Sequence, residues 1–259
     1  MKKTISEIAS ILQQAEKSNI SCPPIRRFFE GKDLEKAYRV QEFIRKEKLA
    51  DGQKIVGKKI GLTSKKVQEQ LGVNEPDFGV LLHEMQISNN GKIPFSDLMQ
   101  PKAEAEIAFV LKKDLTQKNI SIEEMKNAID YAVAAIEIVG SRIENWDIQI
   151  TDTIADNASA SHFVLGEKQV PLENLDLENC QMQMHINGEK VSEGTGKACL
   201  GNPLHAAVWL ADKMVEMGNP LKKGEIILSG ALGPMANLKS GDQVEAEIDG
   251  LGKVLFEVV

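Results

Sequence analysis

The sequence contains few of the residues that build sulfur- or imidazole-based sites. Its 259 residues include only three cysteines, Cys22, Cys180 and Cys199, which are widely spaced and form no CxxC pair. This odd, scattered set argues against a disulfide framework and predicts reduced, buried thiols. The four histidines show neither HxxxH nor HExxH spacing, so a zinc site built on imidazole is not expected.

An excess of positive charge and long apolar segments are also missing. Lysine and arginine number 31 against 38 aspartate and glutamate residues, a formal net charge of -7, which argues against a nucleic-acid partner. The longest apolar runs, such as Tyr131 to Ile136, are far shorter than the roughly 20 residues that span a bilayer. Polar residues also interrupt the N-terminal segment where a signal peptide would need an apolar core. We therefore expect a cytoplasmic protein without membrane or nucleic-acid partners.

Helical periodicity opens the chain. Apolar residues recur at helical spacing over 4–18 and 33–50, on either side of a Pro-Pro turn. We predict that these segments form an N-terminal helical lobe, residues 1–53, which packs against one catalytic domain, residues 54–259. Neither an internal repeat nor a linker rich in Pro, Gly or Ser divides the catalytic domain.

The catalytic domain combines hairpins with a few helices. Asn187-Gly188 between two short strand-like segments predicts a type I′ hairpin, and a second hairpin is expected over 244–258. A Ser-x-x-Glu capping box predicts a long helix over 121–135, and another helix is expected over 203–217. Because strands and helices do not alternate throughout, we predict a mixed α+β fold rather than a doubly wound sheet.

The most informative segment runs from Pro101 to Leu111 and alternates as a strand. Glu104 and Glu106 fall on one face, roughly 6 to 7 Å apart along the strand, and that face continues as Ala108 and Val110. The apolar continuation predicts a buried face. Two carboxylates there would raise each other's pKa and cost stability unless a cation compensates them.

A third carboxylate, Glu137, interrupts the apolar run from Ile136 to Val139. Three carboxylates without cysteine or histidine suit a hard divalent ion, Mg²⁺ or Mn²⁺, which keeps further positions for water or substrate. The alternative is that Glu104 and Glu106 line the solvent face of an edge strand, paired with lysines. The glycine spacing matches neither a dinucleotide fingerprint nor a P-loop, so no nucleotide cofactor is expected.

Six motifs follow one another along nearly the whole chain. They are Gly57-Lys-Lys-Ile-Gly-Leu-Thr-Ser64, Pro76-Asp-Phe-Gly79, Pro101-x-x-Glu-x-Glu106, Glu137-x-Val-Gly-Ser-Arg142, Ala155-Asp-Asn-Ala-Ser159 and Ser229-Gly-Ala-Leu-Gly-Pro234. This ordered set resembles the motifs of 2-keto-4-pentenoate hydratases, which belong to the fumarylacetoacetate hydrolase superfamily. The resemblance implies a mixed β-sheet rolled into a barrel-like core with helices outside. We also expect a homo-oligomer.

The resemblance also implies roles for particular residues. It places the divalent metal on the three glutamates identified above, Lys59 and Asp77 in the acid/base site, and Ser159 near the substrate carboxylate. If Lys59 faces inward from a strand over 55–62, its neighbour Lys58 must face outward. A lysine beside a cation or in an apolar pocket can have a pKa lowered towards neutrality. The motif around Asp77 is equally typical of a turn.

The implied activity is metal-dependent hydration of 2-hydroxypenta-2,4-dienoate to 4-hydroxy-2-oxopentanoate. This is a lyase reaction in the meta-cleavage catabolism of aromatic compounds. The substrate carboxylate and the adjacent enol oxygen form a bidentate pair for the metal, and proton transfer to the far carbon needs a titratable group. We therefore expect a 2-hydroxydienoate or 2-oxo acid substrate, and we allow a complex with a downstream or sister pathway enzyme.

Three alternatives remain open at this point. A sister enzyme, 4-oxalocrotonate decarboxylase, uses the same chelation while carbon dioxide leaves. His162 stands where a small residue is expected in the hydratase form, and this leaves the exact substrate open. Hydrolysis of an acylpyruvate carbon-carbon bond is a more distant alternative. A non-catalytic partner subunit is the third, although the intact candidate ligands and Lys59 argue against a vestigial site.

Overall fold

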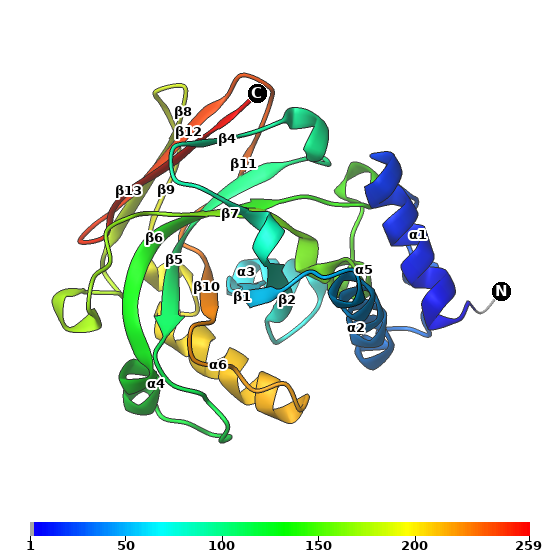
Figure 1. Cartoon of the computed structure of the whole chain (residues 1–259), viewed down its shortest axis with the longest axis horizontal. Helices are drawn as coiled ribbons and strands as arrows, with labels where there is room; N and C mark the ends of the chain where they lie inside the picture. The colour runs from blue at the N-terminus through cyan, green and yellow to red at the C-terminus, as the bar shows by residue number, and fades with distance from the viewer. Residues whose placement is uncertain (1–2) are drawn as a thin grey trace.

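The computed structural model, which describes residues 3–259 apart from the side chains at positions 66, 70 and 71, opens with two helices. These are α1 (Ile5–Ser18) and α2 (Leu34–Ala50), as the sequence predicts. They pack against each other at one edge of the molecule (Figure 1). Their buried residues belong to the same hydrophobic cluster as residues of both sheets. The division of the chain at residue 53 stays a prediction.

An eight-stranded sheet forms the centre of the fold and curls around itself (Figure 1). Its strands are β1 (Ile55–Gly61), β2 (Asp77–Leu82), β3 (Gln86–Ile87), β5 (Lys102–Leu111), β6 (Ile129–Val139), β7 (Ala160–Leu165), β10 (Ile226–Ala231) and β11 (Ala236–Asn237). They follow the order β2-β1-β10-β5-β6-β7-β3, and β11 pairs with β5. The β1–β10 and β3–β7 pairs are parallel, and the other pairs are antiparallel. This mixed, curled sheet confirms the predicted fold class.

A smaller sheet of five strands contains both predicted hairpins. Its strands are β4 (Gly91–Ile93), β8 (Gln181–Ile186), β9 (Glu189–Thr195), β12 (Gln243–Ile248) and β13 (Gly252–Val258), in the order β4-β13-β12-β8-β9. Asn187 and Gly188 join β8 to β9, and both have the positive φ that a type I′ turn requires. Asp249-Gly250 begins the turn between β12 and β13, as expected.

The predicted helix over 121–135 is wrong beyond its first two turns. Helix α4 (Ile122–Ala128) ends early, and the chain continues directly into β6. Strand β6 lies between β5 and β7, and its alternate residues pack into the two hydrophobic clusters on the two faces of the sheet. Every residue from 132 to 139 is therefore buried. A strand buried on both faces is apolar throughout, and hydrophobic periodicity cannot distinguish such a run from a buried helix.

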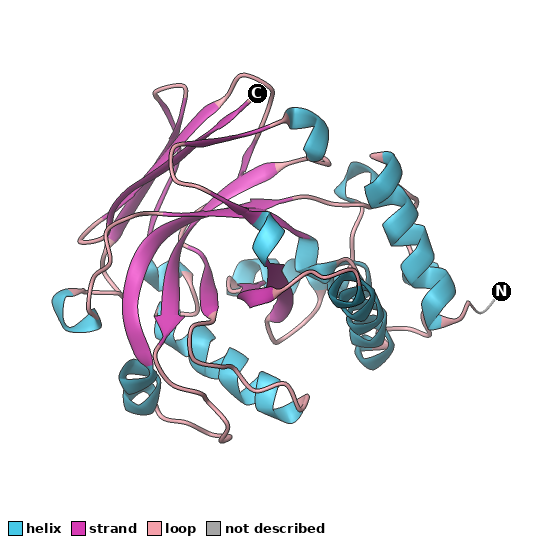
Figure 2. Cartoon of the chain, viewed as in Figure 1, coloured by secondary structure: helices cyan, strands magenta, loops and turns pink. Residues whose placement is uncertain are grey.

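The remaining helices lie around the strands (Figure 2). They are α3 (Lys65–Leu71), α5 (Ile150–Ala155) and α6 (Pro203–Glu216), of which α6 confirms the helix expected over 203–217. A short 3-10 turn, Asn157–Ser159, connects α5 to β7. Within residues 3–259, none of the helices combines the length and the hydropathy needed to cross a bilayer.

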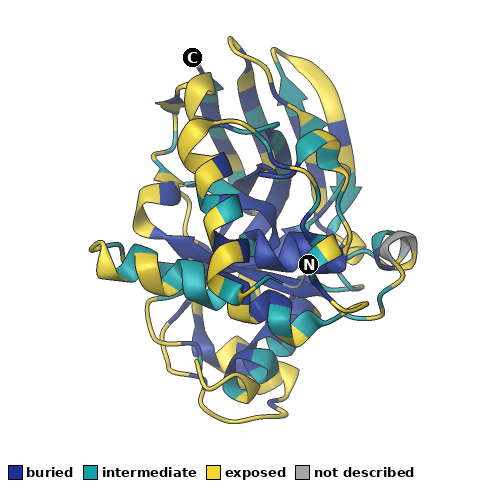
Figure 3. Cartoon of the chain, turned by 90° about the vertical axis from the view of Figure 1, so that its right-hand side faces the viewer, coloured by how far each residue is buried: buried dark blue, intermediate teal, exposed yellow. Residues whose placement is uncertain are grey.

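Two hydrophobic clusters pack on the two faces of the large sheet. The larger cluster joins the helices and the small sheet to the outer face. The smaller one covers the face that carries Glu104 and Glu106, here called the inner face, and includes Ala108, Val133, Phe163 and Leu228. Figure 3 shows the dark blue buried interior beneath the helices. An apolar floor therefore lies beside the glutamates and keeps water away from that side.

Candidate active site

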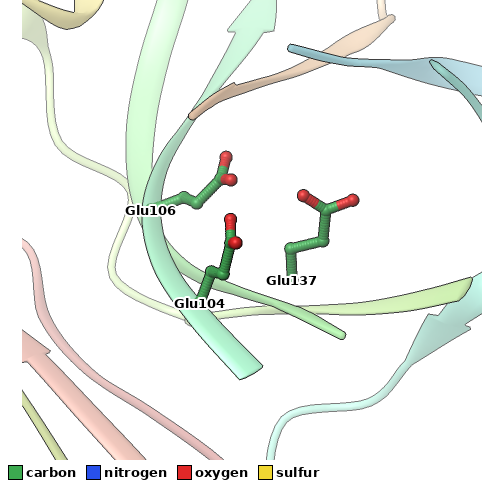
Figure 4. A group of neighbouring side chains, drawn as sticks. All are labelled: Glu104, Glu106 and Glu137. Atoms are coloured by element: carbon green, nitrogen blue, oxygen red, sulfur yellow. The ribbon is translucent and has the colours of Figure 1, made fainter. Parts of the chain in front are cut away.

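Glu104, Glu106 and Glu137 converge on the inner face of the large sheet (Figure 4). One carboxylate oxygen from each residue lies within 4.8 Å of the other two. Glu104 and Glu137 are direct partners across β5 and β6, and Glu106 lies two residues further along β5. Strand β5 lies between β10 and β6, and Glu106 and Glu137 are fully buried. The alternative of an exposed edge strand is therefore wrong.

Burial raises the pKa of all three carboxyl groups. Burial and the charge of Glu137 raise the pKa of Glu104 to about 7. Burial, Glu137 and Glu104 together raise the pKa of Glu106 well above its ordinary value. Burial also raises the pKa of Glu137, although Lys59 opposes that shift. The cluster therefore resists carrying three negative charges without a compensating cation.

Several carboxylate oxygens in this cluster accept no hydrogen bond. They are Oε1 of Glu106 and both Oε1 and Oε2 of Glu137, although Oε2 of Glu137 lies 3.2 Å from Nζ of Lys59 in an ion pair. Oε2 of Glu106 is different, because it accepts a hydrogen bond from the backbone N–H of Gly230 at 2.8 Å. Buried carboxylate oxygens without donors are costly unless they bind a cation. This donor set of converging oxygens fits a hard divalent ion.

Lys59 brings a positive charge to the edge of the cluster. Its side chain is buried on β1, with Nζ 3.2 Å from Oε2 of Glu137 in an ion pair. Nζ also donates a hydrogen bond to the carbonyl oxygen of Ala158 at 3.0 Å. Burial alone would lower the pKa of Lys59, but Glu137 and Asp77 raise it above its ordinary value. Among these side chains the pKa of Lys59 is therefore raised, and not lowered as expected, because several carboxylates surround its ammonium group.

Lys58 points to the outer face of β1, as strand alternation requires, but solvent does not reach it. It is 5% exposed, and its Nζ lies 3.0 Å from both carboxylate oxygens of Glu225. Burial lowers the pKa of Lys58, and the charge of Glu225 opposes that shift. The outward direction predicted for Lys58 is therefore confirmed, and residues of α2 and of the segment after α6 surround its side chain on that face.

Asp77 is the first residue of β2 and is buried on the inner face, so the turn interpretation of its motif is wrong. Burial raises the pKa of Asp77 to about 6, against the opposing effects of Lys59 and of a hydrogen bond from Thr153 at 3.4 Å. Gly61 is its direct partner on β1, and a Cβ at Gly61 would lie 2.2 Å from Oδ1 of Asp77. A carboxyl group that titrates near neutrality suits proton transfer.

Ser159 reaches the same site from the turn after α5. It is 5% exposed, and its hydroxyl lies 3.5 Å from the hydroxyl of Thr153, which also contacts Asp77. The structure thus connects Asp77, Thr153 and Ser159 through two hydroxyl groups. Thr153 is not among the residues predicted from the sequence, where its signal is weak: it is one of three polar residues between the apolar residues Ile150 and Ile154.

His162 lies outside this cluster. It pairs with Ile138 across β6 and β7, whereas Phe163 pairs with Glu137, so His162 belongs to the outer face. Its Nδ1 lies 2.9 Å from the hydroxyl of Ser161, and burial lowers the pKa of the ring. His162 is therefore separated from the glutamates by the sheet itself.

The curled sheet and the buried carboxylate cluster are shared features of one class of protein, and sequence comparison assigns the chain to the same class. The family described as "Fumarylacetoacetate (FAA) hydrolase C-terminal" matches residues 56–259, and the chain belongs to this family. The chain is 50% identical over 246 residues to 2-keto-4-pentenoate hydratase 1 of Dechloromonas aromatica (strain RCB), covering 95% of this chain and 94% of that protein. It is 47% identical over 251 residues to 2-keto-4-pentenoate hydratase of Burkholderia vietnamiensis (strain G4 / LMG 22486), covering 97% of this chain and 96% of that protein.

A solved structure has nearly the same fold over the full length. It is 4-oxalocrotonate decarboxylase from Pseudomonas putida G7, complexed with magnesium and adipate, with a TM-score of 0.94 and 32% sequence identity. The match covers 100% of this chain and 99% of the decarboxylase. The N-terminal helices thus belong to the shared fold.

Proposed function

We propose that this chain is a lyase that hydrates 2-hydroxypenta-2,4-dienoate to 4-hydroxy-2-oxopentanoate with the help of a divalent metal ion. Such a reaction serves the meta-cleavage catabolism of aromatic compounds. The observation that carries the proposal is the convergence of three buried carboxylates with Lys59 and Asp77 on one face of the sheet. Identities of 50% and 47% to hydratases, against 32% to a decarboxylase, favour hydration among the reactions that this site could perform.

Glu104, Glu106 and Glu137 would hold the ion, which we propose to be Mg²⁺ or Mn²⁺, the ions that prefer oxygen ligands and retain open positions. When bound, the ion would act as a Lewis acid for the negative charge that develops on the substrate oxygens. The three side chains are preorganised for this task. Their strands are paired residue by residue, and Gly230 fixes one oxygen of Glu106.

Lys59 is proposed as the group that moves a proton to and from the remote carbon of the substrate. Its ammonium has three N–H donors, of which one meets Ala158 and another faces Glu137. The remaining donor is available to a substrate. Because Lys59 is buried and held by these contacts, its ammonium protons have a fixed position relative to the three glutamates. This positioning is what general acid/base catalysis requires.

Asp77 is proposed to assist Lys59, and Ser159 to donate a hydrogen bond to the substrate carboxylate. With a pKa near 6, Asp77 can take up or release a proton near neutral pH. Thr153 contacts both Asp77 and Ser159, so the two side chains share one hydrogen-bonded wall of the site. The exclusion of bulk water by the apolar floor strengthens the interactions among these groups.

A decarboxylase remains the second candidate, because the full-length structural match is to an enzyme of that name. The test is an ultraviolet assay of the purified protein with Mg²⁺ against 2-hydroxypenta-2,4-dienoate and 2-oxo-3-hexenedioate in parallel. Hydration predicts loss of dienoate absorbance, formation of 4-hydroxy-2-oxopentanoate and no carbon dioxide from the second substrate. Carbon dioxide release without hydration would replace this proposal with the decarboxylase. Inactivity on both substrates would favour a partner subunit or an acylpyruvate hydrolase.

We further propose that the enzyme is a cytoplasmic homo-oligomer, in line with the family resemblance, and that it can form a complex with a downstream or sister pathway enzyme. Light scattering coupled to size-exclusion chromatography measures the mass of the particle directly. A particle of 28.5 kDa, the mass of a single chain, would contradict the oligomer.

A further inference from the structure

The turn Asn157–Ser159 has a backbone that side chains normally avoid. Asn157, Ala158 and Ser159 have φ values of +56°, +49° and +58°, three successive left-handed residues without a glycine among them. L-residues visit this region as single residues, because Cβ then crowds the following carbonyl oxygen. Such a conformation persists only where the surroundings hold it in place, and it is concentrated at functional sites.

Arg142 holds both ends of this turn. Its guanidinium donates hydrogen bonds to the carboxylate of Asp156 and, at 2.7 Å, to the carbonyl oxygen of the same residue. A further hydrogen bond of 3.3 Å reaches the carbonyl oxygen of Ala160, beyond the turn. Arg142 and Asp156 are 9% and 3% exposed, so this clamp is buried. It fixes the two residues that flank the left-handed segment.

Asn157 attaches the turn to strand β2. Its Oδ1 accepts a hydrogen bond from the N–H of Val80 at 2.8 Å, and its Nδ2 donates one to the carbonyl oxygen of Val80 at 3.0 Å. One side chain therefore satisfies both backbone groups of one residue, as a neighbouring strand would. The carbonyl of Asn157 also lies against Gly79, where a Cβ would come within 2.3 Å of its oxygen.

The turn then presents two groups to the proposed active site. The carbonyl oxygen of Ala158 accepts the hydrogen bond from Nζ of Lys59, and the hydroxyl of Ser159 lies beside that of Thr153. The left-handed conformation reverses the chain so that these consecutive residues both face the site. Any rotation of the turn away from β2 would move the acceptor on which the position of Lys59 depends.

We propose that Asn157 is a positioning residue. Its hydrogen bonds to Val80 hold the strained turn against β2, and the turn then fixes the ammonium group of Lys59 through the carbonyl oxygen of Ala158. The expected effect of Asn157 on turnover rests on the proposed function. Its expected effect on the position of Lys59 does not, because the hydrogen bond from Lys59 to Ala158 exists whatever reaction the protein catalyses.

The test compares Asn157→Gly with Asn157→Ala. Glycine adopts positive φ without strain, so Asn157→Gly removes the two hydrogen bonds to Val80 while keeping the backbone conformation accessible. Asn119→Ala is the matched control, since Asn119 is also left-handed, with φ +56°, but is exposed and distant in sequence from the site residues. Asn157→Asp serves as a near-isosteric third variant if alanine prevents folding. As a carboxylate it keeps an acceptor for Val80 but loses the donor.

We expect Asn157→Gly and Asn157→Ala to lower kcat by about 10-fold to 100-fold, the scale of a misplacement of about 1 Å. KM and the affinity for Mn²⁺ should change little, because the three glutamates are untouched. Competitive reductive methylation of the metal-free proteins, read by mass spectrometry, should show increased labelling of Lys59. Lys58, buried on the opposite face, is the internal reference and should not change. Asn157→Asp should fall between wild type and Asn157→Gly, and Asn119→Ala should match wild type.

A folded Asn157→Gly protein with wild-type kcat and wild-type labelling of Lys59 would overturn the positioning role. A fall in Mn²⁺ affinity equal to the fall in kcat would also overturn it, because the damage would then be general. If the wild type fails to hydrate the dienoate while labelling of Lys59 still rises in Asn157→Gly, the positioning role stands and the proposed function fails. The two claims are therefore separable.

Discussion

Glu104 and Glu137 face each other as direct partners across β5 and β6, and both side chains point to the inner face. Like charges directly opposite on paired strands are destabilising, and burial increases the penalty. Glu106 adds a third carboxylate. Removing one of these charges should therefore stabilise the metal-free protein while weakening its ion site.

We predict that Glu106→Gln raises the melting temperature of the metal-free protein. It should lower the affinity for Mn²⁺ by at least about tenfold, since even the loss of a residue that only supports a metal ligand typically costs that much. A glutamine oxygen can still accept the hydrogen bond from Gly230, so the backbone there is preserved. Scanning calorimetry and titration calorimetry give the two quantities. Glu247→Gln, an exposed residue of the small sheet, is the control and should change neither. Unchanged Mn²⁺ affinity in Glu106→Gln would mean that the ion binds elsewhere.

The stability of the metal-free protein should depend on pH in a direction set by its buried carboxyl groups. Burial raises the pKa of Glu104 to about 7 and that of Asp77 to about 6. Each group then keeps a proton in the folded state after the unfolded chain has lost it. The resulting stability is fully present below the unfolded pKa and is lost as pH rises through the folded pKa. We expect the melting temperature in EDTA to fall between about pH 4.5 and pH 7.

Mg²⁺ should reverse this trend, since the ion needs deprotonated carboxylates and its affinity increases as they lose protons. At a hundredfold excess over its dissociation constant, an ion that binds only the folded state contributes about 2.7 kcal/mol of stability. Thermal denaturation across a Mg²⁺ titration at pH 5 and pH 7.5 measures the effect. A melting temperature that ignores Mg²⁺ at both pH values would count against the cluster as an ion site.

The two neighbouring lysines of β1 should respond differently to the same substitution. Lys59→Met should lower turnover by roughly 10² to 10⁴, the usual contribution of general acid/base catalysis, while Mn²⁺ still binds. Lys58→Met should instead destabilise the fold, because it removes the ion-pair partner of the half-buried Glu225, with turnover per folded molecule retained. Steady-state kinetics and melting curves separate the two outcomes. Equal losses of turnover in both proteins would indicate a general electrostatic effect rather than proton transfer by Lys59.

Gly61→Ala should impair the enzyme without changing any charged or polar side chain. The new Cβ would lie 2.2 Å from Oδ1 of Asp77 and 3.6 Å from Nζ of Lys59, so Asp77 must move. We expect turnover to fall by about 10² and Mn²⁺ affinity to persist. Gly241→Ala is the control, because it strains a positive φ of +89° in open space away from the site. Wild-type turnover in a folded Gly61→Ala protein would show that Asp77 need not keep its place.

Alternation along single strands made the central part of the site predictable. Glu104 and Glu106 share a face because the side-chain period of a strand is two, and the apolar residues after them signalled burial. The same rule separated Lys59 from Lys58. Local chemistry also fixed the hairpin at Asn187-Gly188 and the first helices, where caps and turn residues act over a few positions.

The rest depended on contacts between distant segments. The first part of β6 is predicted as a helix because its apolar run lacks a period, and only the packing of both faces of the strand explains that run. The ion pair of Lys58 with Glu225 joins residues 167 positions apart, so the sequence predicted the outward direction of Lys58 but not its partner. Thr153 and Asn157 act through hydrogen bonds to Asp77 and Val80 of β2, which no local pattern in the sequence reveals.

Because Lys58 and Lys59 are adjacent, ionic pairing alone cannot determine the register of β1 with its neighbouring strands. A slip by one residue would bring Lys58 to the inner face and Lys59 to the outer face, so the acidic groups on both faces would still meet a lysine. Glycine opposes such a slip. A Cβ at Gly57 would come within 2.1 Å of the carbonyl oxygen of Ile226, and a Cβ at Gly61 would come within 2.2 Å of the side-chain Oδ1 of Asp77. Any shifted alignment would put a side chain into one of these two places. Steric exclusion at two glycines, rather than ionic pairing, therefore selects the register of β1 in the curled sheet.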